Sequence, residues 1–304
     1  MQAHAEGFKT EASGAESHAE GDATKAEGHS SHSEGTNTEA IGDWTHAEGY
    51  ASKAHADYSH AEGKETNAQG AGSHTEGYGT LTTADGVYGH AEGQGTTVSG
   101  TSAHAEGTNT TASGSGAHAE GNAGTASGDY SHSEGNNTTS SGGMSHAEGN
   151  STSATGLATH AEGSSTTAKG NSAHAEGKST TANGNYSHAE GFETVTNDAS
   201  ETAHAEGYKS KATGIRSHAQ NSETLASGES SHAEGISTTA SGKGSHAQNL
   251  GTIASGESQT AIGKYNIADT TSALIVGNGT STTARSNAFT IDWNGNAFVA
   301  GKIT

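Results

Sequence analysis

The chain has 304 residues, a net charge of −21 at neutral pH, 46 glycines, and neither cysteine nor proline. Only 28% of its residues are hydrophobic and 5% are aromatic, too few for an ordinary globular core. The negative charge argues against nucleic acid and anionic membranes as partners. The lack of cysteine excludes disulfide chemistry, and no apolar run is long enough for membrane insertion.

One unit, Ser-His-Ala-Glu-Gly, recurs through most of the chain, as at residues 17–21. Its histidine returns every 14 residues, except for the 16-residue steps that end at His90 and His204. Disorder does not keep such a register, so the composition does not indicate a disordered chain. The motif histidines are His4, His18, His32, His46, His60, His74, His90, His104, His118, His132, His146, His160, His174, His188, His204, His218, His232 and His246.

Each repeat has a second half, as in Thr110-Thr111-Ala112-Ser113-Gly114, and both halves have the form small-x-Ala-x-Gly. A glycine every seventh residue would cost a helix about 1 kcal/mol each time, whereas the alternation is typical of a strand that ends in a turn. We therefore predict an all-β solenoid whose 14-residue coils stack by parallel pairing around an interior of Ser, Thr, Ala and Gly. Asn221 and Asn249 replace the motif glycine, and asparagine is the residue that next best tolerates positive φ.

Such an interior buries little apolar area, so a single roll is expected to be weakly stable. Oligomerisation is the usual remedy, and we expect the rolls to associate side by side. The two 16-residue repeats should place their extra residues in turns.

We place a boundary after the repeat region, residues 1–263, because residues 264–304 have a different pattern. Ser272-Ala273-Leu274-Ile275-Val276-Gly277 is the first strongly apolar run, and Ala288-Phe289-Thr290-Ile291-Asp292-Trp293 alternates as a strand does. Asn294-Gly295 indicates a hairpin turn. These residues are expected to form a small C-terminal β module that caps the roll.

Aromatic residues recur at two positions of the repeat: directly after the motif glycine, and two residues before the motif histidine. Both positions fall in expected turns. Two interpretations stay open, packing between coils or chains and contact with a glycan or receptor. The residues considered for such a ligand surface are Trp44, Tyr50, Tyr58, Tyr130, Tyr186 and Tyr208.

The repeat resembles the YadA-like head repeats of trimeric autotransporter adhesins over residues 1–263. Gln259-Thr260-Ala261-Ile262-Gly263 and Glu39-Ala40-Ile41-Gly42 are most similar to that family's core sequence. The resemblance implies a left-handed parallel β-roll that forms a side-by-side homotrimer. Residues 273–300, with Val276-Gly277-Asn278-Gly279 and Arg285-Ser286-Asn287-Ala288-Phe289-Thr290, resemble a β module of phage and prophage tail fibres.

The chain departs from that family in its first half-repeat, where His and Glu stand in place of apolar residues that face neighbouring chains. If the trimer geometry applies, stacked rows of His and Glu line the interface and pair across it. Gln220 and Gln248 keep the hydrogen-bonding shape without the charge. The residues assigned to this interface are His18, Glu20, His104, Glu106, His146, Glu148, His174, Glu176, His232 and Glu234.

Three other interpretations of the His and Glu rows remain. Divalent metal binding, for example by His18, Glu20, His146 and Glu148, would use imidazole and carboxylate ligands. A solvent-exposed face is the second. Catalysis is the third, although neighbours on a strand such as Ser17 and His18 point to opposite faces and cannot form a nucleophile–base pair.

The function we expect is that of a structural or adhesive fibre segment, from a phage or prophage tail fibre, that binds a host surface or serves as a spacer. A bacterial or spore surface adhesin is the alternative, and a metal-binding repeat protein is a more distant one. The expected partners are two further copies of the chain and a host cell-surface glycan or protein. We expect an extracellular location, no cofactor and no enzymatic activity.

Overall fold

The computed structural model describes residues 2–301; Met1 and the last three residues of the expected C-terminal module lie outside this range. Internal contacts divide the chain into two units, residues 1–151 and 152–304, which are taken one at a time. Within residues 2–301 all regular structure is strand, as predicted. No helix in this range could cross a membrane.

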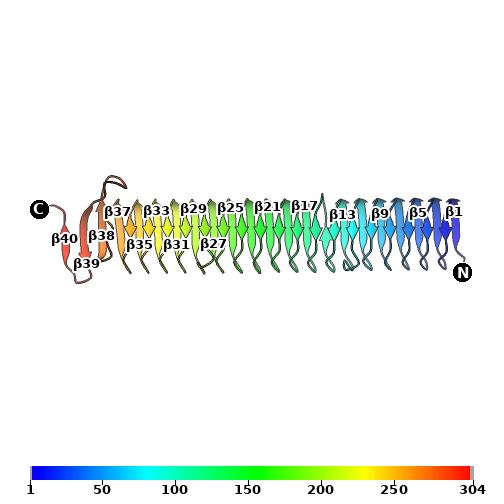
Figure 1. The fold of residues 1–304 in the computed structure, drawn as a ribbon, viewed down its shortest axis with the longest axis horizontal. Coiled ribbons are helices and arrows are strands. Elements are labelled where there is room, and N and C mark those ends of the chain that lie inside the picture. The colour runs from blue at the N-terminus through cyan, green and yellow to red at the C-terminus, as the bar shows by residue number, and fades with distance from the viewer. Residues whose placement is uncertain (1, 302–304) are drawn as a thin grey trace. The chain divides into compact units, whose positions relative to one another are not determined.

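The first unit is a ladder of two-strand coils (Figure 1). Each coil contributes a longer strand to one sheet and a two-residue strand to a second sheet. The first sheet has β1 (His4–Phe8), β3 (His18–Asp22), β5 (His32–Thr36), β7 (His46–Tyr50), β9 (His60–Lys64), β11 (His74–Tyr78), β13 (His90–Gln94), β15 (His104–Ala105), β17 (His118–Asn122), β19 (His132–Asn136) and β21 (His146–Asn150). The second has β2 (Glu11–Ala12), β4 (Lys25–Ala26), β6 (Glu39–Ala40), β8 (Lys53–Ala54), β10 (Asn67–Ala68), β12 (Leu81–Thr82), β14 (Thr97–Val98), β16 (Thr111–Ala112), β18 (Thr125–Ala126) and β20 (Thr139–Ser140).

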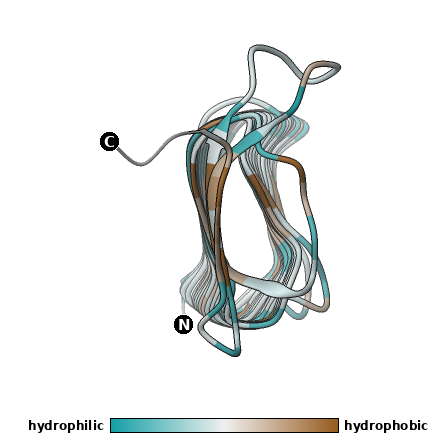
Figure 2. Cartoon of the chain, turned by 90° about the vertical axis from the view of Figure 1, so that its left-hand side faces the viewer, coloured by the Kyte–Doolittle hydropathy of each residue, from teal (hydrophilic) through white to brown (hydrophobic). Residues whose placement is uncertain are grey.

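The second unit repeats this plan and then changes. Its first sheet has β23 (His160–Ser164), β25 (His174–Lys178), β27 (His188–Phe192), β29 (His204–Tyr208), β31 (His218–Ser222), β33 (His232–Ile236), β35 (His246–Leu250), β37 (Thr260–Lys264), β38 (Ser272–Asn278), β39 (Asn287–Asp292) and β40 (Ala297–Val299). Its second sheet has β22 (Ser153–Ala154), β24 (Thr167–Ala168), β26 (Thr181–Ala182), β28 (Val195–Thr196), β30 (Lys211–Ala212), β32 (Leu225–Ala226), β34 (Thr239–Ala240) and β36 (Ile253–Ala254). Seen from the C-terminal end, the strands of a coil form two facing layers (Figure 2).

Neighbouring coils pair in parallel and in register, so each motif residue lies beside its own counterpart. His4 aligns with His18, for example, and Gly7 with Gly21. The 16-residue coils keep this register: Leu81 pairs with Thr97, and Val195 pairs with Lys211. Their extra residues lie between the second strand and the next motif histidine, which confirms that the insertions fall in turns. The parallel solenoid with 14-residue coils is thus confirmed.

The interior consists of small side chains, as predicted. Ala19 and Ala26 are fully buried, and so are Thr24 and Ser17 at 2% exposure or less. The serine hydroxyl bonds locally, since Ser17 Oγ donates to the Gly14 carbonyl at 2.8 Å, whereas Thr24 Oγ1 is buried without a hydrogen-bond partner. Val98 is a larger interior side chain, and it has room because Gly89 faces it: a Cβ at Gly89 would lie 2.6 Å from Val98 Cγ1.

The two glycines of a coil are favoured for partly different reasons. The motif glycine has positive φ, +99° at Gly107, and little space for a Cβ; Asn221 and Asn249 adopt φ of 79° and 83° in its place, as expected. At the glycine that ends the second half, space alone disfavours a side chain, although Ala56 stands at this position in one coil. A Cβ on Gly114 would lie 2.0 Å from the carbonyl oxygen of Gly128 on the next coil.

The residues 264–301 extend the first sheet of the second unit and add a hairpin. β38 pairs in parallel with β37, β39 pairs antiparallel with β38, and β40 pairs antiparallel with β39. The hairpin between β39 and β40 turns at Asn294-Gly295, as the sequence indicates. The second sheet ends at β36, where two buried side-chain amides satisfy backbone groups that no further strand pairs with. Asn266 exchanges hydrogen bonds of 2.7 and 2.9 Å with the backbone of Ile253, and Gln259 accepts from Ser255 N at 2.8 Å.

We predict losses of different size for two glycine-to-alanine changes in the first unit. Gly114→Ala should destabilise the fold by about 3 kcal/mol, because the methyl group overlaps the next coil's backbone. Gly79→Ala should cost only about 1 kcal/mol, the penalty of alanine at positive φ, since Gly79 has open space and Ala23 and Ala51 adopt φ of 57° and 55° at equivalent turn positions. Chemical denaturation of both variants measures the difference, and equal losses of stability would contradict this account.

Candidate functional site

Histidine rings form a stacked column on the outer face of the first sheet in each unit. From His18 to His146, successive ring centroids are 4.7–4.9 Å apart and the planes differ by 2–9°. From His174 to His246 the values are 4.7–4.8 Å and 1–8°. The column exists because strand side chains alternate: Ser17 and Ala19 point inward, so His18 and Glu20 point outward.

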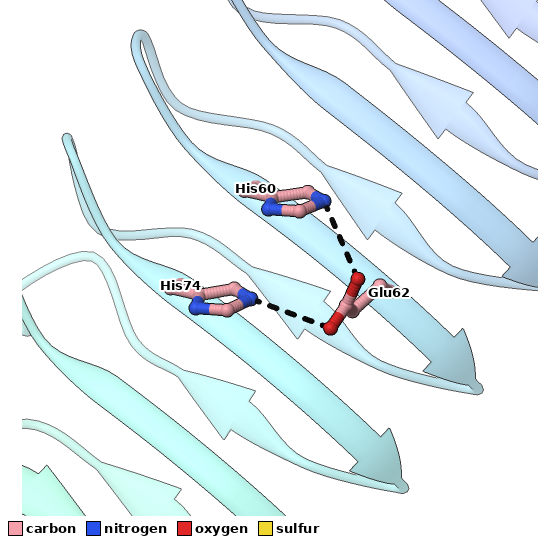
Figure 3. Close-up of side chains that lie close together, drawn as sticks. All are labelled: His60, Glu62 and His74. Atoms are coloured by element: carbon pink, nitrogen blue, oxygen red, sulfur yellow. Dashed lines mark ion pairs between the residues drawn. The ribbon is translucent and has the colours of Figure 1, made fainter.

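A parallel column of glutamates lies beside the histidines. Within a coil, the distance from His Nε2 to the nearest Glu oxygen is 3.4–4.0 Å wherever a pair forms. Some carboxylates also face the histidine of the next coil. Glu62 lies 3.8 Å from His60 Nε2 and 3.9 Å from His74 Nε2, one oxygen toward each ring (Figure 3).

The residues predicted for the trimer interface all lie on this outer His and Glu face. All are half-exposed in the single chain except Glu176, which is exposed. Four of the five predicted pairs are within 4.0 Å, those of His18, His104, His146 and His174 with the glutamate of the same coil. Glu234 instead lies 3.5 Å from His246 Nε2 and accepts a hydrogen bond from Gln220 Nε2 at 2.8 Å.

In the first unit the glutamate column alternates between two kinds of carboxyl group. Hydrogen bonding with Glu48 and burial raise the pKa of Glu34 to about 7. The same hydrogen bond, with that of Glu62, holds the pKa of Glu48 below its usual value. Neighbouring carboxyls therefore share a proton. The other carboxyls whose pKa is raised to about 7 are Glu62, Glu92 and Glu120, and the others whose pKa is lowered are Glu76 and Glu106.

Burial, followed by the positive charge of neighbouring imidazoles, lowers the pKa of several column histidines, including His60, His104 and His232. These rings are therefore neutral at neutral pH. The Nε2 atoms of both units' columns are buried, and those of His60, His74, His204 and His218 have no hydrogen-bond partner. The sequence predicted His and Glu side by side on one strand face. It did not predict that imidazoles stack on imidazoles and carboxyls lie against carboxyls.

Gln220 replaces a glutamate of the column and supplies a hydrogen-bond donor that a carboxylate lacks. Its amide donates to Glu234 at 2.8 Å, in the place where another glutamate would have to hold a proton. Along this stretch the residues on successive coils are Glu206, Gln220, Glu234 and Gln248, so acid and amide alternate. Glutamine here keeps the hydrogen-bonding shape of glutamate without its charge.

An open groove of about 630 Å³ lies over the glutamate and glycine columns of the first unit. The glutamate side chains that line this groove are open to solvent because the neighbouring motif glycines have no side chains. The lining residues are Glu6, Gly7, Glu20, Gly21, Glu34, Gly35, Glu48, Gly49 and Gly63.

The aromatic residues considered for a ligand surface are all exposed. Trp44 and Tyr58 stack with centroids 5.0 Å apart and planes 5° from parallel, in turns where both have positive φ. Tyr130 and Tyr186 occupy the same turn position on single coils, with φ of 57°. Tyr50 and Tyr208 lie at the last residue of strands β7 and β29 instead of in turns. Tyr208 stacks on Phe192 at 5.4 Å.

Several groups in the column have the geometry of possible metal ligands. His60, Glu62 and His74 each bring one ligand atom within 4.8 Å of the other two, as do His90, Glu92 and His104. Of the metal ligands considered from sequence, His18 and Glu20 form one pair and His146 and Glu148 another, at 3.8 and 4.0 Å. Ser17 does not face His18, because its hydroxyl points inward.

Comparison with known protein families found no family that matches the chain, and comparison with curated proteins found no similar protein.

We predict that Glu34→Gln makes stability less sensitive to pH. The pKa of Glu34 is about 7 in the folded chain and near 4.5 when unperturbed, so its stabilising contribution is lost as pH rises from 4.5 through 7. The difference in melting temperature between the variant and the original chain should therefore increase over this range.

Glu39→Gln on the second sheet is the matched control with the opposite sign. Burial raises the pKa of Glu39, but hydrogen bonds from Lys53 and His55 outweigh burial and leave the pKa below its usual value. This contribution is present at neutral pH and lost as pH falls. Glu39→Gln should thus be less stable than the original chain at pH 7 and equal to it in acid. Parallel pH profiles for the two variants would contradict proton sharing in the column.

Proposed function

We propose that the chain is a segment of a structural or adhesive fibre, in which three copies associate side by side through the His and Glu face. The observation that supports this is the face itself, a half-exposed column of stacked imidazoles and carboxylates in each unit. A narrow interior of Ala, Ser and Thr gives each chain little apolar burial, so association of chains supplies stability that one chain lacks.

The chemistry of the face suits contact between chains more than contact with water alone. Most histidine and glutamate side chains of this face are half-exposed, so a neighbouring chain can reach them. Carboxylates and imidazoles from neighbouring chains would supply donors and acceptors to each other. The left-handed sense of the roll and the trimer both follow from the resemblance to YadA-like head repeats.

The fibre belongs by this proposal to a phage or prophage tail, outside the cell, because residues 273–300 resemble a tail-fibre β module. In that setting the roll is a spacer or binds a host-surface glycan or protein, and the C-terminal β module caps it. A bacterial or spore surface adhesin built on the same roll is the alternative. The observation that favours a binding role is the exposed stack of Trp44 and Tyr58.

Spin labels test the trimer, since the chain has no cysteine and accepts single labelling sites. We expect sedimentation to give a trimer. Labels at Glu106→Cys, on the His and Glu face, should lie closer together than labels at Thr111→Cys on the second sheet. A monomer, or shorter distances at Thr111 than at Glu106, would contradict the proposed arrangement.

Replacing the aromatic stack tests the binding role. We expect Trp44→Ala with Tyr58→Ala to abolish binding to a glycan array or to host cells without unfolding the chain, because stacked rings provide the flat surface that sugars cover. Ala158 occupies the same turn position with φ of 54°, so alanine is tolerated there. Tyr130→Ala, at a single unstacked ring, is the control. Unchanged binding by the double variant would assign the stack to packing alone.

A further inference from the structure

The His and Glu distances are too long for hydrogen bonds. Glu62 faces His60 Nε2 at 3.8 Å and His74 Nε2 at 3.9 Å, whereas N–H···O bonds measure about 2.7–3.2 Å. Both Nε2 atoms are buried and lack a hydrogen-bond partner. An ion bound at about 2.0–2.2 Å to each donor joins atoms roughly 3.3–3.8 Å apart at ordinary ligand angles. The two Glu–His gaps are close to the span of a metal ion, whereas the rings of His60 and His74 stack 4.7 Å apart and must turn toward each other to share one.

The donors themselves suit a transition metal. Two imidazoles and one carboxylate are ligands typical of Zn²⁺, Co²⁺ and Ni²⁺. The groove along the glutamate column ends at Gly63, the residue next to Glu62.

We propose that His60, Glu62 and His74 bind one divalent transition-metal ion, with water in the remaining positions. Groups of the same composition, His90–Glu92–His104 and His118–Glu120–His132, bind further ions in the same way. This inference uses contacts within one chain only and does not rest on the proposed trimer.

Two constraints follow from the stacking. Ions on successive coils would lie about 4.8 Å apart and repel strongly, and each ion uses two imidazoles, so ions bind at alternate coils. The rings must also tilt, because parallel rings direct their lone pairs along parallel lines. The column permits such a tilt: His160 and His174 are 49° from parallel at an unchanged centroid distance of 4.9 Å.

Zn²⁺ binding to the full chain tests the proposal. Equilibrium dialysis with elemental analysis should show several ions per chain, and Zn²⁺ should shift the ¹⁵N resonances of histidine Nε2. The triple variant Glu62→Gln, Glu92→Gln and Glu120→Gln should bind fewer ions than the original chain, although the triads of Glu106 and Glu134 remain. It should fold, because Gln220 and Gln248 already occupy this position, and circular dichroism verifies that it does.

The control is Glu16→Gln, Glu27→Gln and Glu65→Gln, three exposed glutamates outside the column. This variant should bind as many ions as the original chain. No Zn²⁺ binding by the original chain, or equal binding by the two variants, would overturn the inference. Sedimentation of the same samples reports the trimer separately, so failure of one proposal is distinguishable from failure of the other.

Discussion

In-register parallel stacking is the constraint on which the rest of this molecule depends. Each coil places every residue beside its counterpart, about 4.8 Å away, so any side chain must be compatible with a copy of itself. The interior meets this condition with alanine and hydroxyl side chains, and the tightest positions meet it with glycine, as at Gly114 against Gly128. Variation is concentrated in the turns, where side chains such as Trp44 and Tyr58 are exposed.

Stacking like on like is simple for alanine and difficult for charged groups. A column of carboxylates at this spacing would repel itself, and the chain avoids this in two ways. In the first unit alternate carboxyls retain a proton that neighbours share, as at Glu34 beside Glu48. Near Glu234 the sequence alternates acid and amide, and Gln220 supplies the donor permanently. Burial also lowers the pKa of several column histidines, such as His232, which disfavours positive charge on rings that stack on one another.

The sequence predicted the coil because period, alternation and glycine spacing all reflect the backbone. It could not predict features that depend on how one coil meets the next. Positive φ at Tyr58 and Trp44 is imposed by the turn, although tyrosine and tryptophan do not favour it. Two tertiary contacts have no signature in the sequence. Gly89 leaves space for Val98, and the side-chain amide of Asn266 bonds the backbone of β36. Proton sharing likewise requires the register, since glutamates 14 residues apart in sequence give no sign of contact.

Stacking of each imidazole between two others also changes how readily the His and Glu face binds a partner. An isolated surface histidine with a carboxylate nearby contributes little, because solvent screens it and side-chain freedom is lost. In a column each ring is held between two others, so its orientation is fixed before any partner arrives. Preorganised side chains bind a partner with less loss of entropy, which favours contact with a neighbouring chain, whereas a metal ion requires the rings to tilt. The repetition that limits the interior to small residues is therefore what makes the outer face of the same strands suited to binding.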